Sequence, residues 1–421
     1  MGEVKVSSVS FIQGRGSDFC RGCLGTNLFS ALDLGELPIA NELLITKVSD
    51  IQKFPLHLRV CLDCCLGQVG DVVKPERIFR DYRYLSSMST TFLKHASDFV
   101  TSQINSGLFT TGDWVLEIAS NDGYLLRNFL NSDIKTLGVE PAENVAEISK
   151  SLGIETITEF FSSSLAIELF QDHGYPKLII ANNVMAHVPD LMDFIKGLSI
   201  LCGPKTKISL ENPSLENILI GKQFDTIYHE HYSYLSASSV SRISKTFGLQ
   251  LVKVEKLSIH GGSNRYWLQK ETNTSVNDLS TPDMINHETH IGLFEVDKWL
   301  GFSSEVQRIL SNFQSWLIAK NNNGEIVYGY GAAAKASTIL NSINIAPGLI
   351  LGIADVSLEK QNRFMPPHGI EIISPEELFK LSPKNIVIFP WNIKSEIAAF
   401  LRSRFNTDAR FWCAIPEMHE I

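Results

Sequence analysis

The sequence lacks an excess of positive charge and any long apolar segment. Among its 421 residues, 37 are lysine or arginine and 46 are aspartate or glutamate, which gives a formal net charge of −9. Surfaces that bind nucleic acid usually show a basic excess or stripe, so this balance argues against a nucleic-acid partner. No apolar run reaches the roughly 20 residues that cross a bilayer, and we therefore expect no membrane span.

The sequence also lacks a recognisable targeting segment and a disulfide framework. The opening residues MGEVKVSSVSF contain no basic region followed by an apolar core, and Val6 stands where a myristoylation signal requires Ser or Thr. The seven cysteines are odd in number and gather near the N-terminus instead of being spread along the chain. We therefore expect reduced thiols and a cytoplasmic protein, either a monomer or a weak homo-oligomer.

Four of the cysteines form two closely spaced pairs. Two residues separate Cys20 from Cys23, and two separate Cys61 from Cys64. This gap lets both sulfurs of a turn reach one metal ion, so the spacing predicts a zinc site with four thiolate ligands. Four protein ligands leave no open coordination position, and the zinc is expected to be structural. A redox pair or a set of buried thiols is the alternative, and Cys65 is interpreted as a bystander.

Composition and periodicity predict an α/β protein of two or three domains. Hydrophobic residues make up 44% of the chain and charged residues 20%, as is typical of globular proteins. From about residue 112, short apolar strands alternate with amphipathic helices, which indicates a parallel sheet covered by helices. Expected strands cover residues 114–118, 136–140, 177–181, 207–211, 250–254 and 264–269, with a helix through residues 125–129. A helical connector near 284–321 precedes a second α/β block, with strands near 326–330, 349–354, 370–373 and 385–389.

The turn after the first of these strands suits an adenosyl ligand. Glu117 lies at the end of this strand, Asn121-Asp122-Gly123 forms the turn, and Glu140 ends the next strand. An acid at the second strand tip can accept both hydroxyls of a ribose. A dinucleotide would require a G-x-G-x-x-G turn for its pyrophosphate, whereas S-adenosylmethionine has no phosphate. The turn therefore favours methyl transfer, although acids at strand ends also serve simple solvation.

The second block opens with a glycine turn of a different kind. Gly329-x-Gly331-x-x-Ala334 matches the dinucleotide fingerprint in outline, and Asp355 lies about where a ribose acid belongs. Lys335 at the start of the following helix suggests a diphosphate bound at the helix N-terminus. A turn that only packs helix against strand is the alternative. An NAD-linked oxidoreductase would use this motif, but it leaves the first turn unexplained.

Residues 228–234 read Tyr-His-Glu-His-Tyr-Ser-Tyr. In an extended segment, Tyr228 and Glu230 would share one face with the later tyrosines, while His229 and His231 would share the other; in a tight loop, neighbours can converge. A histidine beside a carboxylate is the usual equipment of a general base. The segment therefore indicates proton transfer, with a polar loop that satisfies its own hydrogen bonds as the alternative.

Seven motifs in this order make the chain similar to the zinc-containing, S-adenosylmethionine-dependent sugar C-methyltransferases of bacterial deoxysugar pathways, which act at C-3′ of nucleotide-linked 4-keto sugars. The resemblance covers nearly all residues. It rests on the cysteine pairs, residues 81–87 (DYRYLSS), 117–123 (EIASNDG), 186–190 (AHVPD), 228–234, 260–263 (HGGS) and 329–335 (GYGAAAK). The departures are Ala119 and Cys65, where glycine is usual.

The resemblance implies a division of the chain and a reaction. It implies a zinc-binding lobe over 1–85, a methyltransferase domain over 86–280, and a helical connector with a C-terminal nucleotide-sugar-binding α/β domain over 281–421. By similarity, His231 removes the proton next to the ketone, with Glu230 as its orienting or tuning partner, and the resulting enediolate attacks the methyl group. An O- or N-methyltransferase on a related molecule is an alternative with the same fold.

Further site residues follow from the same resemblance. Tyr228, His187 and one of Tyr82 and Tyr84 are expected to contact the sugar or its oxyanion. For His187, a position just before a helix that starts near Pro189 is a purely structural alternative. The residues expected at S-adenosylmethionine are Glu117, Asn121, Asp122, Gly123, Glu140 and Asn183. The residues expected at the nucleotide sugar are Gly329, Gly331, Lys335, Asp355 and His260.

Overall fold

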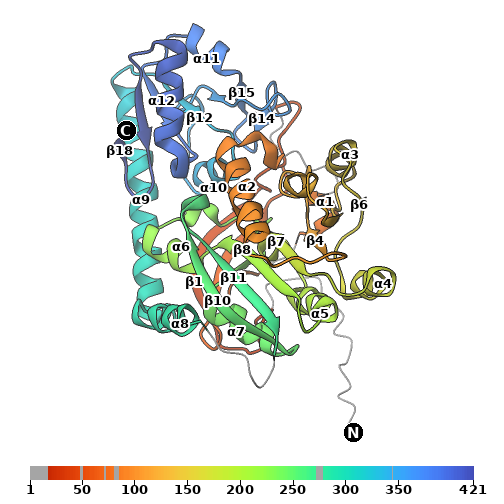
Figure 1. Cartoon of the computed structure of the whole chain (residues 1–421). Helices are drawn as coiled ribbons and strands as arrows, with labels where there is room; N and C mark the ends of the chain where they lie inside the picture. Colours follow the sequence, from red (N-terminus) through yellow and green to blue (C-terminus); the bar gives the residue numbers. More distant parts are fainter. Residues whose placement is uncertain (1–17, 48–50, 71–72, 80–84, 272–277, 344) are drawn as a thin grey trace.

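The computed structural model describes residues 18–47, 51–70, 73–79, 85–271, 278–343 and 345–421. Three sheets with covering helices make up this part of the chain (Figure 1). The predicted α/β class is confirmed. Among the described helices, none has both the length and the apolar character that crossing a membrane requires.

The first sheet is small, antiparallel and built mostly from the N-terminal region. Its order is β1 (Leu28–Leu37), β2 (Phe54–Cys61), β3 (Gly67–Val69) and β9 (Ser233–Tyr234). The last strand comes from residues far along the chain, and Gly67 pairs with Tyr234. The last two residues of the 228–234 segment therefore form a strand of the N-terminal sheet.

The central sheet has the order β10-β11-β8-β7-β4-β5-β6. Its parallel part consists of buried apolar strands, as expected for a sheet covered on both faces, and an antiparallel hairpin closes one edge. The strand bounds are β4 Trp114–Ile118, β5 Lys135–Val139, β6 Thr156–Ile157, β7 Leu178–Asn182, β8 Lys207–Pro213, β10 Leu249–Leu257 and β11 Ser263–Lys270. The covering helices are α2 Thr90–Asn105, α3 Glu143–Ser151, α4 Ser163–His173, α5 Leu191–Leu201, α6 Leu215–Gly221 and α7 Ala237–Lys245.

One predicted helix in this region is wrong in kind. Residues Leu126–Phe129 form a short 3₁₀ helix, η2, in place of an α-helix. Tyr124, Leu125 and both ends of this turn are buried. Leu126 and Phe129 point into the core while Arg127 between them is exposed, and the segment ends after this single turn without extending into a longer amphipathic helix.

The C-terminal sheet has the order β14-β15-β13-β12-β16-β17-β18, with five parallel strands at its centre. Its strands are β12 Val327–Tyr330, β13 Ile353–Ala354, β14 Phe364–Met365, β15 Ile370–Ile373, β16 Asn385–Ile388, β17 Arg410–Cys413 and β18 His419–Glu420. Its helices are α10 Ala334–Asn341, α11 Pro375–Lys380 and α12 Lys394–Phe405. The strand expected over 349–354 is confined to its last part, because the turn at Pro347–Gly348 extends through Ile350.

A long helix joins the N-terminal and C-terminal sheets. After α1 (Pro75–Phe79) in the N-terminal region and α8 (Ser280–His290), helix α9 (Val296–Asn322) runs along one side of the molecule (Figure 1). Trp299 and Phe313 of α9 share one apolar core with Leu32 of β1 and Val387 of β16. This shared core connects the N-terminal sheet with the C-terminal sheet.

Candidate active site and zinc centre

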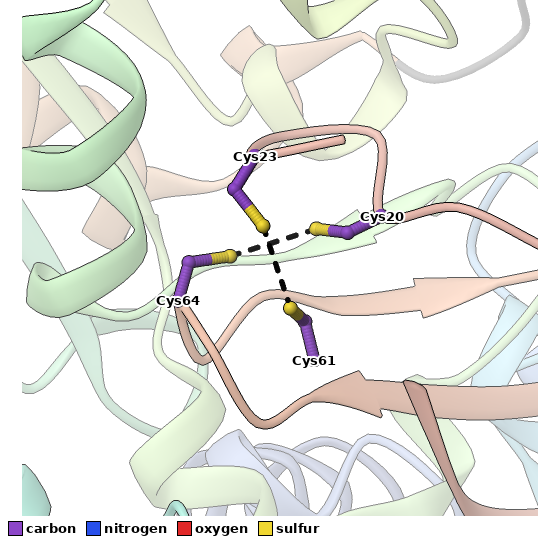
Figure 2. Close-up of side chains that lie close together, drawn as sticks. All are labelled: Cys20, Cys23, Cys61 and Cys64. Atoms are coloured by element: carbon purple, nitrogen blue, oxygen red, sulfur yellow. Dashed lines mark hydrogen bonds between the residues drawn. The ribbon is translucent and has the colours of Figure 1, made fainter. Parts of the chain in front are cut away.

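Four cysteine sulfurs meet between the first two turns of the N-terminal region (Figure 2). All four lie within 4.8 Å of one another, with 3.5 Å between Cys20 and Cys64 and 3.6 Å between Cys23 and Cys61. A zinc ion with Zn–S bonds of about 2.3 Å requires sulfurs about 3.8 Å apart, so the cluster fits a tetrahedral zinc. The predicted zinc ligands are thus brought together.

The two cysteine turns share a backbone device. In each, the residue after the second cysteine has a left-handed conformation, with φ of +62° at Leu24 and +60° at Cys65. The amide of Leu24 donates to the Cys20 carbonyl and that of Cys65 to the Cys61 carbonyl. A left-handed residue favours glycine, which explains physically why glycine is usual where this chain has Cys65.

The turn after β4 is held by the acid at the end of β5. The backbone amide of Asn121 donates to Glu140 Oε2 at 2.9 Å, and the amide of Ala142 donates to Oε1 at 2.9 Å. The turn is strongly left-handed, with φ of +52° at Ala119, +49° at Asn121 and +77° at Gly123. Glu140 therefore shapes the turn while its remaining lone pairs stay available for ribose hydroxyls.

Several polar atoms around this turn are buried and have no hydrogen-bond partner among the described residues. They include Glu117 Oε2, Asp122 Oδ1 and Asn183 Oδ1. Burial, together with the charges of Glu140 and Asp122, raises the pKa of Glu117 well above its usual range. A ligand with hydroxyl and amine donors and a positive charge would satisfy these groups, and S-adenosylmethionine has all three. The residues therefore fit this cofactor.

A short helix covers the cofactor turn, and sequence reasoning did not assign it this role. Helix η1 (Ser86–Met88) directs its first amides at the turn: Ser86 N donates to Asn121 Oδ1 at 2.8 Å and Ser87 N to Asp122 Oδ2 at 3.2 Å. These contacts orient both side chains. The expected Tyr82 and Tyr84, a few residues earlier, lie outside the described residues.

The 228–234 segment places Tyr228 and His231 in direct contact. The Tyr228 hydroxyl lies 2.9 Å from His231 Nε2, and His231 Nδ1 lies 3.0 Å from the Thr226 carbonyl. The carbonyl can only accept, so Nδ1 carries the hydrogen and Nε2 accepts from the phenol. The His231 amide closes the turn onto the Tyr228 carbonyl at 2.9 Å. The alternate-face arrangement is wrong here, because this part of the segment is a tight turn.

His187 joins the Tyr228–His231 pair from the loop after β7. Its Nδ1 lies 2.8 Å from the Glu230 carbonyl, and its ring centroid lies 4.7 Å from that of His231. Desolvation lowers the pKa of His187 to about 4 and, with the neighbouring His187, lowers the pKa of His231 well below its usual range. Both imidazoles are therefore neutral near pH 7, as a proton acceptor must be.

The expected pairing of Glu230 with the His231 imidazole is wrong. Glu230 Oε1 accepts from the backbone and side-chain nitrogens of Asn41, each at 3.1 Å, and the His231 ring uses Thr226 as its partner. Burial raises the pKa of Glu230 to about 7. The carboxyl group faces the N-terminal region, where it fixes the loop after β1.

The C-terminal glycine turn is filled by the protein's own atoms. Asp355 Oδ2 accepts from the Ala332 amide at 2.8 Å, Oδ1 accepts from Ser357 at 2.9 Å, and the Lys360 ammonium lies 3.6 Å away. A Cβ at Gly331 would lie 2.4 Å from Pro390. These contacts do not favour the expected roles of Asp355 and Gly331 in holding a ligand.

Lys335, on the first turn of α10, faces the segment that carries the Tyr228–His231 pair. Its ammonium lies 2.9 Å from Asn392 Oδ1 and 4.0 Å above the Trp391 ring, whose Nε1 donates to Asp225 Oδ2 at 2.8 Å. Withdrawal from water lowers the pKa of Lys335 to about 8. The positive charge of Lys335 also contributes to the lowered pKa of His231 and of His260.

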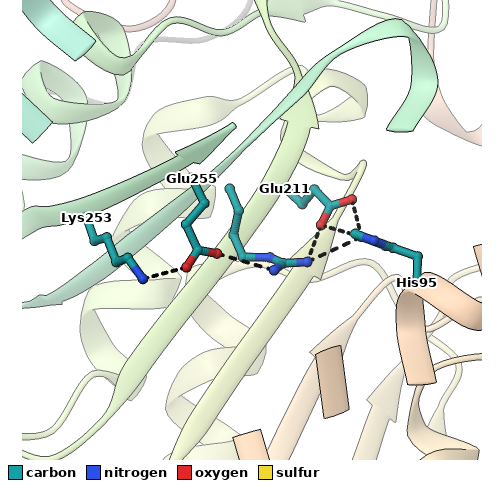
Figure 3. Close-up of polar contacts among 5 residues, drawn as sticks. His95, Glu211, Lys253 and Glu255 are labelled. Carbon is teal, nitrogen blue, oxygen red and sulfur yellow. Dashed lines mark hydrogen bonds and ion pairs between the residues drawn. The ribbon is translucent and has the colours of Figure 1, made fainter. Parts of the chain in front are cut away.

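A chain of charges crosses the central sheet beside this site (Figure 3). Glu211 on β8, with a fully buried side chain, contacts His95 at 2.9 Å and Arg265 at 2.7 Å; Arg265 continues to Glu255, and Glu255 to Lys253. Glu211, Arg265 and Glu255 are register neighbours on three adjacent strands. The sequence prediction missed this row of ion pairs. Charged residues at matching positions of neighbouring strands could have indicated it.

Comparison with known proteins supplies the class of enzyme. A family described as "Putative zinc binding domain" matches residues 20–79, one described as "Methyltransferase domain" matches 92–254, and one described as "C-methyltransferase C-terminal domain" matches 258–416. With the thiol cluster and the cofactor turn, these matches define a zinc-binding, S-adenosylmethionine-dependent methyltransferase. Together the three matches run from residue 20 to residue 416, so the chain is similar to C-methyltransferases over most of its length.

A full-length relative agrees with this assignment. C-methyltransferase NovU of Streptomyces niveus is 29% identical over 402 residues, which cover 95% of this chain and 96% of NovU. Among solved structures, magnesium protoporphyrin IX methyltransferase of Synechocystis PCC 6803 with bound S-adenosylmethionine is 13% identical, with a TM-score of 0.32, and the match covers 43% of this chain and 79% of that one. An S-adenosylmethionine-dependent methyltransferase of Clostridium acetobutylicum is 12% identical, with a TM-score of 0.34, 43% of this chain and 92% of that one being covered.

The enzyme class and both cofactors are thereby confirmed: the chain is an S-adenosylmethionine-dependent C-methyltransferase with a four-cysteine zinc site. This result decides against the NAD-linked oxidoreductase, which the C-terminal glycine motif had left open. It also favours carbon over oxygen or nitrogen as the methyl acceptor.

Proposed function

We propose that the enzyme methylates a carbon beside the ketone of a nucleotide-linked 4-keto deoxysugar, at C-3′. The Tyr228–His231 pair carries this proposal. An unactivated sugar carbon is not nucleophilic, so carbon methylation requires prior loss of a proton, and an adjacent ketone makes that proton acidic. Oxygen and nitrogen acceptors have lone pairs and do not require this step. A buried, neutral base beside His187, in the loop after β7, therefore supports a keto substrate.

Tyr228 and His231 act as a unit in the proposed proton transfer. His231 Nε2 already accepts the hydrogen bond of the Tyr228 hydroxyl. When the Tyr228 oxygen takes the proton from the sugar carbon, the phenolic hydrogen therefore passes to His231 Nε2. The Thr226 carbonyl holds the imidazole in the required tautomer. S-adenosylmethionine, when bound, supplies the methyl group to the carbon that has lost its proton.

The proposed roles of the remaining residues follow from their charge states. His187 is neutral and donates through Nδ1, so its Nε2 can accept a sugar hydroxyl. The Lys335 ammonium and His260 are proposed to face the oxyanion side of the sugar. We propose that Glu117, Asn121, Asp122, Gly123, Glu140 and Asn183 hold the cofactor.

The division of the chain at residues 85 and 280 and the cytoplasmic location are also proposals. They are supported by the three sheets and by the free cysteines. The nucleotide part of the substrate is a further proposal, which the resemblance implies. We propose a monomer or weak oligomer.

The test uses thymidine-diphosphate-linked 4-keto-6-deoxy sugars and their 4-hydroxy counterparts. We expect C-methylation of the ketone only, seen as a new carbon-bound methyl group by NMR. His231→Asn should bind both ligands but lose about 10²- to 10⁴-fold in turnover, the usual contribution of an acid–base group. It should also lose exchange of deuterium from solvent into the reacting carbon.

The matched control is His229→Asn, in the same segment. The His229 ring contacts the Phe54 carbonyl and lies outside the Tyr228–His231 hydrogen bond, so this variant should retain deuterium exchange. Normal exchange in His231→Asn would refute the assignment of the base. Methylation of the 4-hydroxy sugars would refute the keto substrate.

A further inference from the structure

The zinc centre and the Tyr228–His231 turn are linked by hydrogen bonds through one arginine. Arg21 lies between the zinc ligands Cys20 and Cys23, and its side chain is directed at Val69 in β3 and at Tyr232, the residue before β9. Its Nη1 donates to the Tyr232 carbonyl at 2.5 Å, and its Nη2 donates to the Val69 carbonyl at 2.6 Å. This contact joins two residues that are 211 positions apart in the chain.

The backbone around Arg21 is held by hydrogen bonds as well. The Arg21 amide donates to Gln68 Oε1 at 2.8 Å, and Gln68 Nε2 donates to the Phe19 carbonyl at 3.0 Å. The Arg21 side chain is 8% exposed and Gln68 is fully buried. A planar guanidinium with two short hydrogen bonds to carbonyls of adjacent strands fixes their spacing more tightly than a point charge would.

The second cysteine turn holds the other end of the same segment. Ser236 Oγ donates to the carbonyl of Cys65, the residue after the last zinc ligand, at 2.8 Å. Between these two contacts, the Val69 amide donates to Tyr232 O at 3.1 Å. The chain that leaves His231 is therefore fastened to both metal-binding turns within five residues.

We propose that Arg21 is a positioning residue for C-methylation, which transmits the geometry of the zinc-binding turn to the Tyr228–His231 pair. The proposal rests on the base assignment above. In this proposal the zinc also helps to position the turn that carries Tyr228 and His231, in addition to stabilising the N-terminal region. Arg21 itself does not touch the reacting groups; it acts through the Tyr232 carbonyl.

The test compares Arg21→Met and Arg21→Lys with the unaltered enzyme, all at one zinc per chain as measured by metal analysis. Misplacement of a reacting group by about 1 Å can cost about 10²-fold in rate. We therefore expect kcat to fall on the order of 10²-fold in Arg21→Met, with the affinity for S-adenosylmethionine unchanged. A lysine can reach one carbonyl only, so Arg21→Lys should recover part of the loss.

Amide hydrogen exchange provides a readout that does not depend on activity. In Arg21→Met, the peptide over residues 226–236 should exchange faster, while peptides from β4 and β12 should not change. Arg410→Met serves as the control, because Arg410 pairs with Glu420 on the distant β17–β18 edge and its loss should leave residues 226–236 unchanged.

Unchanged exchange over residues 226–236 with unchanged kcat in zinc-loaded Arg21→Met would overturn the proposal. If the methionine variant fails to fold or hold zinc, zinc-loaded Arg21→Lys decides by the same two measurements. A failed base assignment would look different: His231→Asn would remain active, while Arg21→Met would still accelerate exchange over residues 226–236.

Discussion

The two strand–turn–helix units of the molecule each hold their turn through an acid at the end of the neighbouring strand. They differ in which groups occupy the space beside the turn. In the central sheet, Glu140 accepts the amide of the turn and an amide two residues downstream; in the C-terminal sheet, Asp355 does the same. The central turn leaves buried polar atoms without partners among the described residues. The C-terminal turn is closed by Lys360 and Pro390.

An acid at the end of a strand therefore does not by itself indicate a bound ligand. Asp355 has its charge balanced by Lys360, which also donates to the Ala332 carbonyl at 2.9 Å. At Glu140, burial and the charge of Asp122 raise the pKa, and no lysine or arginine among the described residues pairs with Glu140, Glu117 or Asp122. The unbalanced site is the one that suits a cationic cofactor.

Gly331→Ala should have the largest effect on stability. The residue has φ of +87°, and an added Cβ would lie 2.4 Å from Pro390 Cδ. The left-handed conformation and the overlap together should lower the free energy of unfolding by roughly 2–4 kcal/mol. Thermal or denaturant unfolding measures the loss. A loss no larger than the left-handed conformation alone explains, roughly 1–2 kcal/mol, would show that Pro390 does not fill the space beside Gly331. The folded variant should bind S-adenosylmethionine normally.

Glu140→Ala should weaken S-adenosylmethionine binding by about 1.5–3 kcal/mol, the range for a lost hydrogen bond to a charged group. Isothermal calorimetry measures the change. Asp355→Ala is the matched control in the other turn and should leave cofactor affinity unchanged. Equal losses in the two variants, or a preference of the central site for a nicotinamide dinucleotide, would contradict the comparison.

Ala119→Gly should stabilise the protein by about 1 kcal/mol, the opposite sign from the change at Gly331. Alanine at φ of +52° adopts a conformation that costs an L-residue roughly 1–2 kcal/mol, and glycine removes most of that cost while adding some unfolded-state entropy. A rise in melting temperature with retained methyl transfer is expected. A lower melting temperature would show that the alanine methyl contributes packing that outweighs the strain.

Lys335→Met should have the smallest effect. It should raise the KM for the sugar substrate and shift the pH dependence of kcat/KM. Lys335 adds to the desolvation and His187 effects that lower the pKa of His231, so removing its charge raises the His231 pKa. His231 must be neutral to accept a proton, and the acid limb of the kcat/KM profile should therefore move to higher pH. Lys360→Met, which serves the filled turn, should leave that limb in place.

The elements that the sequence predicted best are those set by local pattern. The strand at 370–373 and the strand at 114–118 were predicted to the residue, because apolar runs bounded by turn residues leave little freedom. The zinc ligands were predicted from spacing alone, since two residues between cysteines fix the reach of both sulfurs.

The parts that could not be predicted depend on contacts between distant residues. Glu230 is separated by 189 positions from its partner Asn41, and no local pattern links them. The convergence of Tyr228 and His231 requires the Thr226 carbonyl and the pairing of β9 with β3, both of which follow from the packed fold. The filling of the C-terminal turn by Pro390 likewise arises 59 positions away from Gly331, where only tertiary packing decides.

Strand β9 is synthesised late, and this constrains the order in which the chain can fold. The N-terminal sheet is made first during synthesis, yet its fourth strand arrives about 160 residues later, after most of the central sheet has emerged. Until then the edge of β3 lacks its β9 partner, and exposed strand edges invite association with other chains. A ribosome-bound nascent chain that ends before residue 233 should therefore depend on chaperones, and the N-terminal region expressed alone should aggregate even when supplied with zinc.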